Sequence, residues 1–452
     1  MSDTKTSEFT DRFAKLNALR KSGVNPYPER YERTHHSAEA IAEAEKSRTR
    51  EMDKVVASPK SAVRLAGRLT AFRSHGKISF ADLMDFSGKI QLCLAQNVLG
   101  EKAYEDFAKK IDVADFIGVS GELTKTRTGQ ITLIVKEYIL LGKTLRPLPE
   151  KWHGLQDVEA KYRCRYLDTI MDRSSLDRFL LRTRLISLIR KYLDEREFIE
   201  VETPILSPKA SGAFAKPFIT HHHALDQDFY LRIAPETYLK RLIVGGFERV
   251  YEFAKCFRNE GIDPSHHQEF TMLEYYVAYF NYEDNMKFTE ELCAYFLKEL
   301  FGKLKLGIYG TNIDFKPPYP RKTMRDLILE HAKIDISKIK TADKLRLEIK
   351  KKKITIDEDI SKLGFGNLVD VLYKKTTRPH LIQPIFVTQY PIELSPLARK
   401  NDKNPALTDR FQLVVNGWEI VNAYSELIDP KDQEERFCEQ AAAKARGDEE
   451  AH

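Results

Sequence analysis

Cysteine and long apolar runs are both scarce in this chain of 452 residues. The five cysteines are widely scattered and none stands in a Cys-x-x-Cys pair, which argues against a zinc site or a disulfide framework. No segment approaches the roughly 18 consecutive apolar residues that a membrane span needs. The polar residues 1–10 also lack the apolar segment of an export signal. We therefore expect a cytoplasmic protein with free thiols and no membrane segment.

A strong excess of charge is missing as well. The formal net charge of +6 permits a nucleic-acid partner but does not by itself argue for one. Apolar residues make up 42% of the chain and charged residues 31%, which is typical of a globular protein. The length leaves room for two or more domains.

The first part of the chain contains two different patterns. Residues 1–60 are charged and predict a helical extension, because apolar residues recur at helical spacing in "TDRFAKLNALRKSG". Residues 61–142 contain short alternating segments such as "AVRLAGRLTAFR" and "GKIQLCLA", which predict strands. About five strands in this length predict a small antiparallel barrel of the OB-fold type. Residues 143–172, rich in proline with little periodicity, predict a linker.

Residues 173–452 predict a second domain. "LDRFLLRTRLISLIRKYLDEREF" predicts a long amphipathic helix, and "FIEVETPIL" predicts a strand closed by Pro204. Strand-like and helical segments then mix without a βαβ rhythm, which favours an antiparallel sheet flanked by helices. A lysine-rich helical insertion is expected at about residues 324–375. The predicted fold class is therefore α+β, an N-terminal OB-fold barrel followed by an antiparallel sheet with helices.

Three local signals have an ordinary interpretation. The lysine run in "IKKKKI" is a solvated helix face and not a nucleic-acid clamp. "HHH" at residues 221–223 resembles a metal site, but neighbouring strand side chains point to opposite faces, so we do not expect them to share one ion. "GFG" at residues 364–366 lacks the context of a phosphate-binding loop.

The segment "FRNEGIDPSHHQEFTMLE" is the most informative in the chain. Read as two strands, it places Phe270, Met272, Glu274 and Tyr276 on one face, and Arg258 and Glu260 share parity on the preceding strand. His266 lies in the connecting loop. An arginine can hold a phosphate bidentately and an aromatic face can stack a nucleobase. The alternative is an ion pair on a wet sheet face with the aromatic residues in the core.

Long segments resemble the class II lysyl-tRNA synthetases. "AKCFRNEGIDPSHHQEFTMLEYYVAY" is similar to motif 2 of that family, and "FIEVETPIL" is similar to the end of its motif 1. "AGRLTAFRSHGKISFADLMDFSGKIQL" resembles its anticodon-binding OB domain, and "LRPLPEKWHGLQDVEAKYRCRYLD" its interdomain linker. "DFYLRIAPETYLKRLIVGGFERVYE" and "NGWEIVNAYSELIDPKDQ" resemble its amino-acid site. The resemblance thus implies a class II catalytic sheet behind the barrel.

The resemblance implies that ATP and lysine form lysyl-adenylate and that the lysyl group then passes to the 3′ end of tRNA(Lys). Neither step needs a covalent enzyme intermediate, so alignment and charge stabilisation would supply the rate. By the same resemblance, Arg258 would be the central catalytic residue, bridging the lysine carboxylate and the α-phosphate. Glu260 and His266 would position ATP, and Phe270 would stack on adenine.

The resemblance also assigns the lysine-binding residues. Glu236 would hold the α-amino group with help from the backbone around Gly212, and Asn422 would complete the site. Glu274, Tyr276 and Glu426 would surround the ε-ammonium group. Two acids near the side-chain ammonium suit lysine better than aspartate or asparagine, so the charge of the site supports the same substrate.

In the OB domain, Phe80 matches an aromatic residue that stacks on an anticodon base, and Gln91 matches a residue that reads a base edge. Single-strand readers use barrel aromatics in this way. The alternative for Phe80 is an ordinary core residue of a strand.

The sequence departs from the family pattern at a magnesium site. The hairpin "RFQLVVNGWEIVN" turns at Asn416-Gly417, which predicts a type I′ turn. Counting from that turn places Gln412 and Glu419 on one face, diagonally related. The family carries glutamate at both positions and holds Mg²⁺ there with ATP. Because an amide offers no charge, we expect weakened Mg²⁺ binding.

The resemblance ends before motif 3, so we expect a chain truncated before that motif. A catalytically inactive paralogue or fragment that binds tRNA or a protein partner is the alternative function. A protein-modifying lysine ligase is a third, but such relatives lack the anticodon domain. Motif 1 resembles a dimer interface and predicts a homodimer, although its apolar stripe could instead pack within its own chain.

Overall fold

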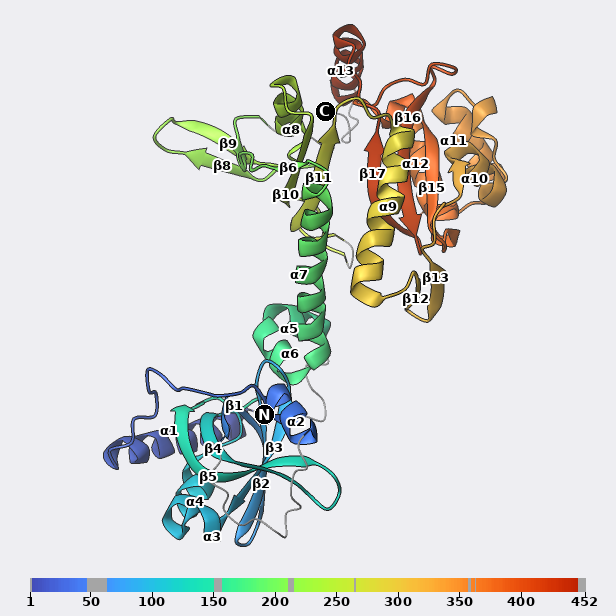
Figure 1. The fold of residues 1–452 in the computed structure, drawn as a ribbon. Coiled ribbons are helices and arrows are strands. Elements are labelled where there is room, and N and C mark those ends of the chain that lie inside the picture. The colour runs from blue at the N-terminus through green and yellow to red at the C-terminus, as the bar shows by residue number, and fades with distance from the viewer. Residues whose placement is uncertain are drawn as a thin grey trace. The chain divides into compact units, whose positions relative to one another are not determined.

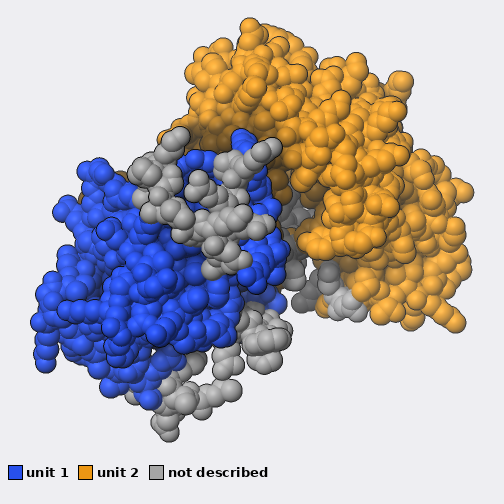
Figure 2. All heavy atoms as spheres, turned by 60° about the horizontal axis from the view of Figure 1, so that its bottom comes forward, with its two compact units in different colours: residues 1–176 blue, residues 177–452 orange. Residues whose placement is uncertain are grey.

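The computed structural model describes residues 2–46, 63–149, 157–209, 215–263, 266–356, 359–361 and 363–445. Gly212, predicted to help hold the α-amino group, lies outside the described residues. Contacts divide the chain into unit 1, residues 1–176, and unit 2, residues 177–452, which Figure 2 colours separately. The finer division into extension, barrel, linker and catalytic domain stays a prediction.

Unit 1 contains a closed five-stranded barrel with the strand order β1-β2-β3-β5-β4 (Figure 1), as the alternating segments predict. Alternate residues face inward, and the core includes Leu65, Leu83, Leu92 and Leu133. The strands are β1 (Val63–His75), β2 (Ile78–Met84), β3 (Lys89–Ala95), β4 (Phe116–Lys125) and β5 (Ile131–Gly142).

Helices of unit 1 pack against this barrel. Leu19 of the first helix and Phe107 of the fourth belong to the barrel core. The first helix ends before Gly23, whose positive φ of 77° suits the end of a helix. The helices are α1 (Ser2–Lys21), α2 (Ser37–Lys46), α3 (Gln96–Leu99), α4 (Glu101–Lys110), α5 (Val158–Arg163) and α6 (Arg165–Met171).

Unit 2 combines several small sheets with helices, consistent with the predicted α+β class. Its sheets have the orders β11-β10-β6, β7-β9-β8, β12-β13 and β14-β15-β16-β17. Most neighbours are antiparallel, and the pairs β10·β6 and β14·β15 are parallel. The strands are β6 (Ile199–Glu200), β7 (Leu206–Ser207), β8 (Ile219–His222), β9 (Gln227–Leu231), β10 (Arg249–Phe257), β11 (Glu269–Val277), β12 (Lys305–Ile308), β13 (Thr311–Asp314), β14 (Arg321–Thr323), β15 (Ile385–Pro391), β16 (Leu407–Val415) and β17 (Trp418–Tyr424).

The helices of unit 2 include the long helix that the sequence predicts, and three helices, α10 to α12, lie in the range expected for an insertion. The long helix begins in the last residues of unit 1 and continues into unit 2. The α-helices are α7 (Arg173–Asp194), α8 (Glu236–Val244), α9 (Tyr282–Phe301), α10 (Met324–Ala332), α11 (Ala342–Lys351), α12 (Phe365–Thr376) and α13 (Pro430–Ala445). Short 3₁₀ turns are η2 (Ile336–Lys338), η3 (Arg378–His380) and η4 (Ile392–Leu394).

Helix α9, drawn in yellow in Figure 1, contributes side chains to the cores of both main sheets of unit 2. One core joins α9 to alternate residues of β16, including Phe411 and Leu413. A second core joins α7 and α9 to Tyr251 and Tyr275 of the β10–β11 hairpin. Helices α10, α11 and α12 cover the other face of the four-stranded sheet. The even-numbered face of the β10–β11 hairpin is thus left to carry polar side chains.

The strand predicted for residues 198–206 is wrong over most of its length. Only the two residues of β6 pair with β10, and β7 starts at Leu206. Between them the Thr203 hydroxyl donates to Glu252 Oε2 at 2.6 Å, and Arg232 Nη1 donates to the Thr203 carbonyl at 3.0 Å. Side chains therefore satisfy backbone groups that a longer strand would have paired, and Pro204 has no amide hydrogen to offer.

Candidate active site and nucleic-acid surface

The β10–β11 hairpin places Arg258 beside Phe270, as the alternation in the sequence predicts. Cys256 pairs with Phe270 in the ladder, and Arg258 continues it by donating its amide to the Gln268 carbonyl at 2.8 Å. The guanidinium carbon of Arg258 lies 5.1 Å from the centre of the Phe270 ring. Arg258 Nε is buried and has no hydrogen-bond partner among the described residues. A planar cation with an unpaired donor beside an aromatic face suits a nucleotide phosphate.

Three carboxylates from different parts of unit 2 form an acidic cluster, Glu236, Glu274 and Glu426. Glu236 opens α8 and is 6% exposed, Glu274 lies on β11, and Glu426 follows β17. Tyr276 donates its hydroxyl to Glu274 Oε1 at 2.8 Å. Glu274 Oε2 is buried and has no hydrogen-bond partner within the described part of the chain. An unpaired carboxylate oxygen away from water is costly, so this atom is suited to receive a cationic donor.

Two carboxyl groups of the acidic cluster, those of Glu274 and Glu426, have raised pKa values. Burial, with repulsion from Glu236, raises the pKa of Glu274 to about 8. Burial also raises the pKa of Glu426 to about 7, although Lys240 acts in the opposite direction. The pKa of the Tyr276 phenol is raised well above its ordinary value by burial and by Glu274, so Tyr276 remains a hydrogen-bond donor. Strongly shifted groups of this kind are typical of functional sites.

Two residues of this site carry interactions that the sequence analysis did not assign. Lys240 Nζ lies 2.7 Å from Glu236 Oε1 and 2.8 Å from Glu426 Oε2. The Tyr424 hydroxyl donates to Glu236 Oε1 at 2.6 Å. The signals were present, because Lys240 follows Glu236 by one helical turn and Tyr424 lies two strand positions after Asn422.

Asn422, predicted to complete the lysine site, is exposed and bound to a neighbouring arginine. Arg410 Nε donates to Asn422 Oδ1 at 2.9 Å, and its Nη1 donates to the Leu394 carbonyl at 2.7 Å. The guanidinium of Arg410 also lies 4.5 Å from the centre of the Tyr390 ring. Arg410 thus fixes the orientation of the Asn422 amide, which leaves the amide nitrogen pointing elsewhere as a donor.

Glu260 and His266, predicted to position ATP, both lie beyond the strands of the hairpin and are exposed. Glu260 Oε1 accepts a long hydrogen bond of 3.4 Å from the Lys216 amide. His266 Nδ1 lies 2.7 Å from Asp263 Oδ2. The hairpin therefore does not bring these two side chains into the acidic cluster, and their roles stay predictions.

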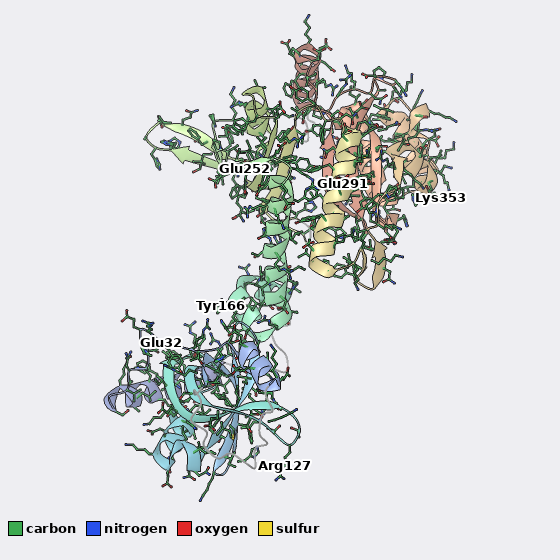
Figure 3. The ribbon with its side chains drawn as sticks, viewed as in Figure 1. Glu32, Arg127, Tyr166, Glu252, Glu291 and Lys353 are labelled. Atoms are coloured by element: carbon green, nitrogen blue, oxygen red, sulfur yellow. The ribbon has the colours of Figure 1, made fainter. Side chains whose placement is uncertain are left out.

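A buried ion pair lies on the same face of the hairpin as Glu274, because Glu252 is the ladder partner of Glu274. Arg232 Nη1 lies 2.7 Å from Glu252 Oε1, and both side chains are 5% exposed. Figure 3 labels Glu252 on its strand. Arg232 Nε also donates to the Lys255 carbonyl at 2.8 Å. Because both charges are buried, each needs the other, and the pair fastens β10 to the segments before it.

On unit 1, Phe80 and Gln91 lie on the outer face of the barrel. Their strand neighbours Ala81 and Leu92 point into the core, so the two side chains point outward. Phe80 is half-buried and does not belong to the barrel core, which disfavours its interpretation as an ordinary core residue. Gln91 Oε1 accepts from the Thr132 hydroxyl at 2.9 Å, so its amide hydrogens remain as donors for a base edge.

Comparison with known proteins assigns the family. Residues 157–452 match the family described as tRNA synthetases class II (D, K and N), and residues 63–141 match the OB-fold nucleic acid binding domain. The chain is 46% identical to a lysine–tRNA ligase of Carboxydothermus hydrogenoformans over 98% of its own length and 87% of the relative. The chain belongs to the lysine–tRNA ligase family of class II tRNA synthetases.

Two further lysine–tRNA ligases show the same extent of similarity. The chain is 48% identical to that of Thermoanaerobacter pseudethanolicus, over 98% of its own length and 86% of the relative. It is 47% identical to that of Dehalococcoides mccartyi, over 95% of its own length and 84% of the relative. The resemblance inferred from the motifs is thus confirmed at the level of the family.

Gln412, expected to weaken a magnesium site shared with Glu419, has its side-chain oxygen already engaged. The Tyr390 hydroxyl donates to Gln412 Oε1 at 2.6 Å, which engages the one oxygen the amide could offer a cation. The type I′ turn is confirmed by positive φ values at Asn416 and Gly417, but a register shift after Leu413 places Gln412 opposite Asn422. Among the described residues, no group of three or more His, Cys, Asp or Glu side chains could hold a metal ion.

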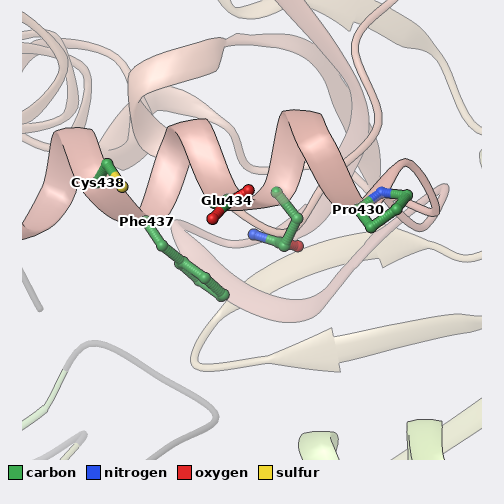
Figure 4. A pocket seen from close by; sticks show the side chains of 5 residues that line it. Pro430, Glu434, Phe437 and Cys438 are labelled. Atoms are coloured by element: carbon green, nitrogen blue, oxygen red, sulfur yellow. The ribbon is translucent and has the colours of Figure 1, made fainter.

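Two other surface features, at His221 and along α13, lie apart from the residues predicted for the active site. His221 Nδ1 lies 3.0 Å from Asp228 Oδ1, and His221 and His223 face each other across 5.2 Å. A pocket along α13 is lined by Pro430, Gln433, Glu434, Phe437 and Cys438 (Figure 4), none of which was predicted to belong to the active site. No helix within the described ranges is both long enough and apolar enough to span a membrane.

Proposed function

We propose that this chain activates L-lysine with ATP and transfers the lysyl group to the 3′ end of tRNA(Lys). Glu274 Oε2 is the observation that carries this proposal. It is a buried carboxylate oxygen without a hydrogen-bond partner in the described chain, beside Tyr276 and within an acidic cluster. A side-chain ammonium would supply the missing partner, whereas the carboxylate of an aspartate substrate would be repelled.

The first step would join lysine to the nucleotide. A carboxylate oxygen of lysine attacks the α-phosphorus of ATP, the new oxygen–phosphorus bond forms, and pyrophosphate leaves with the electrons of the broken bond. Arg258, with its unpaired Nε beside Phe270, would lie across the lysine carboxylate and the α-phosphate and stabilise the added charge. Glu236 would hold the α-ammonium group while Phe270 supports adenine.

The second step would move the lysyl group to tRNA. A hydroxyl of the terminal adenosine attacks the lysyl carbonyl carbon, the ester bond forms, and AMP leaves while the hydroxyl proton passes to the departing phosphate or to water. No side chain needs to form a bond to substrate in either step. The contribution of the protein is therefore alignment and charge, which matches a site built from Arg258 and three carboxylates.

Lysine-dependent exchange between ATP and labelled pyrophosphate tests this proposal on the 452-residue chain. We expect exchange with lysine and none with arginine or aspartate. Loss of exchange in the Arg258→Ala variant, with circular dichroism unchanged, would assign the step to this site. A folded chain that shows no exchange with lysine would contradict the proposal and favour the inactive alternative, which no feature of the acidic cluster supports.

We infer that Mg²⁺ accompanies ATP and meets only one protein carboxylate at the expected site, Glu419. Gln412 is engaged with Tyr390 and carries no charge, so it would add little to the binding of a hard cation. When bound, Mg²⁺ would supply positive charge that neutralises the phosphates.

We further propose that the chain forms a homodimer in the cytoplasm. On α7, Phe179 is 45% exposed and Leu181 38% exposed, and Ile199 on β6 is 51% exposed. Apolar side chains in this number on one helix and its neighbouring strand favour an interface. Analytical ultracentrifugation at micromolar concentration should show a dimer, and a Leu181→Asp variant should sediment as a monomer. A wild-type chain that remains monomeric would contradict this interface.

A further inference from the structure

Lys240 is a cation inside the acidic cluster. It lies on α8, one turn after Glu236, and its ammonium contacts Glu236 Oε1 at 2.7 Å and Glu426 Oε2 at 2.8 Å. Its side chain is 28% exposed, so the aliphatic part is largely covered. A single ammonium thus joins a carboxylate of α8 to a carboxylate that follows β17.

In the proposed function, the same two carboxylates bind opposite ends of the substrate lysine. Glu236 would hold the α-ammonium of lysine, and Glu426 would help hold the ε-ammonium. Their distance therefore sets the length of amino acid that the site accepts. Because Lys240 contacts both, it fixes that distance through a charge-assisted bridge.

The surroundings of Lys240 favour a fixed position. The Tyr424 ring centre lies 5.8 Å from Lys240 Nζ, and the Tyr424 hydroxyl donates to the same Glu236 oxygen that Lys240 contacts. Burial opposes the charge of Lys240, but Glu236 and Glu426 outweigh it, so the pKa of Lys240 lies above its ordinary value. Lys240 is therefore charged throughout the neutral pH range.

The balance of charge shows what Lys240 changes. Glu236 and Lys240 come from α8, Glu274 and Tyr276 from β11, and Tyr424 and Glu426 from β17 and the segment after it. Without Lys240, three carboxyl groups would face one another, and Glu274 and Glu426 would hold a proton more strongly, because Lys240 lowers the pKa of both. With Lys240, Glu236 and Glu426 each have a cation within 2.8 Å, whereas Glu274 Oε2 is buried and has neither an ion pair nor a hydrogen bond from the described residues.

We propose that Lys240 is a positioning and specificity residue for the amino acid, because its ammonium ties Glu236 to Glu426 and holds the two carboxyl groups at the spacing that L-lysine requires. The proposal rests on the function proposed above. It assigns Lys240 no contact with the reacting atoms, and its effect on the reaction is transmitted through the two carboxylates.

The test compares Lys240→Met and Lys240→Arg in the full chain by lysine-dependent ATP–pyrophosphate exchange between pH 6.5 and 8.5. For Lys240→Met we expect the KM for lysine to rise about tenfold at pH 7, with a smaller change in kcat and in the KM for ATP. The KM should recover as the pH rises, since the carboxyl groups then ionise without Lys240. Lys240→Arg should retain a pH profile close to that of the wild type.

Lys255→Met is the matched control, because Lys255 lies on β10 with its side chain 54% exposed and its Nζ 3.8 Å from Glu269. It should leave KM and kcat unchanged. An unchanged pH profile in Lys240→Met would overturn the proposal. A rise in the KM for ATP as large as the rise in the KM for lysine would also overturn it, because it would indicate general damage to the site. Equal defects in Lys240→Arg and Lys240→Met would also overturn it, because charge would then not be the cause. Absence of exchange in the wild type would instead refute the proposed function itself.

Discussion

The carboxyl group of Glu274 couples lysine binding to pH at the scale of a single residue. Burial and Glu236 raise its pKa to about 8, so in the free protein most of this group is protonated at pH 7. An ammonium ligand favours the ionised carboxylate. If lysine binds beside Glu274 as proposed, its binding at pH 7 should release a proton from this group.

We predict that lysine affinity rises with pH up to about 8 in the absence of ATP. Between pH 7 and 8 each binding event should release about one proton, so the affinity should increase by up to about tenfold per pH unit, and below pH 7 more steeply because Glu426 is then protonated as well. Isothermal titration calorimetry at pH 6, 7 and 8 measures the affinity. Repetition in two buffers of different ionisation enthalpy measures the number of protons released.

Glu274→Gln is the matching variant, since the amide keeps the shape and can still bind the Tyr276 hydroxyl. It should weaken lysine binding by about 2 kcal/mol or more, roughly thirtyfold, because the buried charge partner of the ammonium is lost. The pH dependence between pH 7 and 8 should shrink with it, leaving the part below pH 7 that belongs to Glu426. A variant that still releases a proton on binding lysine would assign the titration to another group.

A second prediction at the residue scale concerns Gln412 and the Mg²⁺ requirement of the reaction. In the Gln412→Glu variant, a carboxylate would stand beside Tyr390 and on the side of the sheet where Glu419 was predicted to meet Mg²⁺. A hard cation gains from added negative charge. The Mg²⁺ concentration for half-maximal exchange should fall by about threefold or more. Gln412→Met is the control without a carboxylate, and an unchanged Mg²⁺ requirement in Gln412→Glu would show that this position does not meet the metal.

At the scale of an element, the β10–β11 hairpin depends on the buried pair of Arg232 and Glu252. Removal of one partner leaves a buried charge without compensation, so Arg232→Met should lower the free energy of unfolding by about 3–5 kcal/mol. Urea unfolding followed by circular dichroism measures the loss. The double variant Arg232→Met/Glu252→Leu should recover part of it, because neither charge then remains buried.

The control for this pair is an exposed ion pair in the same unit. Lys305 Nζ lies 3.2 Å from Asp314 Oδ2, and the two side chains are 78% and 41% exposed. Lys305→Met should change the free energy of unfolding by less than about 1 kcal/mol. If Arg232→Met were as mild as Lys305→Met, the hairpin would not depend on the buried pair.

Periodic elements could be predicted from the sequence, because the side chains on one face of a strand or helix are buried or exposed together along its whole length. The alternation of the hairpin predicted that Phe270, Glu274 and Tyr276 share a face. The apolar spacing of residues 176–198 predicted the long helix α7. The strand expected in "FIEVETPIL" is shorter than predicted, since pairing with β10 ends near Val201 and the Arg232 side chain then bonds the Thr203 carbonyl. Tertiary contacts decided that segment.

Register and bridging charges are harder to predict than periodicity. Counting from the turn at Asn416 did not foresee the shift that sets Gln412 opposite Asn422, because a bulge leaves no regular signal in the pattern. Lys240 meets Glu426 across a long stretch of chain. Helical spacing could suggest only the first of its two partners, Glu236.

At the scale of the whole molecule, two units carry two different kinds of recognition. The acidic cluster and Arg258 belong to residues 177–452, and the outward pair of Phe80 and Gln91 belongs to residues 1–176. Amino-acid activation involves only lysine and ATP, whereas aminoacylation also involves tRNA. The two activities should therefore respond separately to changes in the two units.

We predict that Phe80→Ala impairs aminoacylation and spares activation. Loss of base stacking costs about 1–3 kcal/mol, so kcat/KM for tRNA(Lys) should fall by about fivefold or more. Lysine-dependent ATP–pyrophosphate exchange should remain at the wild-type rate, because that reaction contains no tRNA. Steady-state aminoacylation with purified tRNA(Lys) and exchange on the same preparation measure both quantities.

Ile78→Ala is the control, because Ile78 begins the same strand with its side chain 41% exposed and was not assigned to anticodon binding. It should leave both activities close to those of the wild type. Arg258→Ala should show the converse pattern to Phe80→Ala, with exchange lost while tRNA binding, measured by filter retention, remains. If Phe80→Ala lowered exchange as much as aminoacylation, the two units would not act separately and the barrel surface would have to influence activation directly.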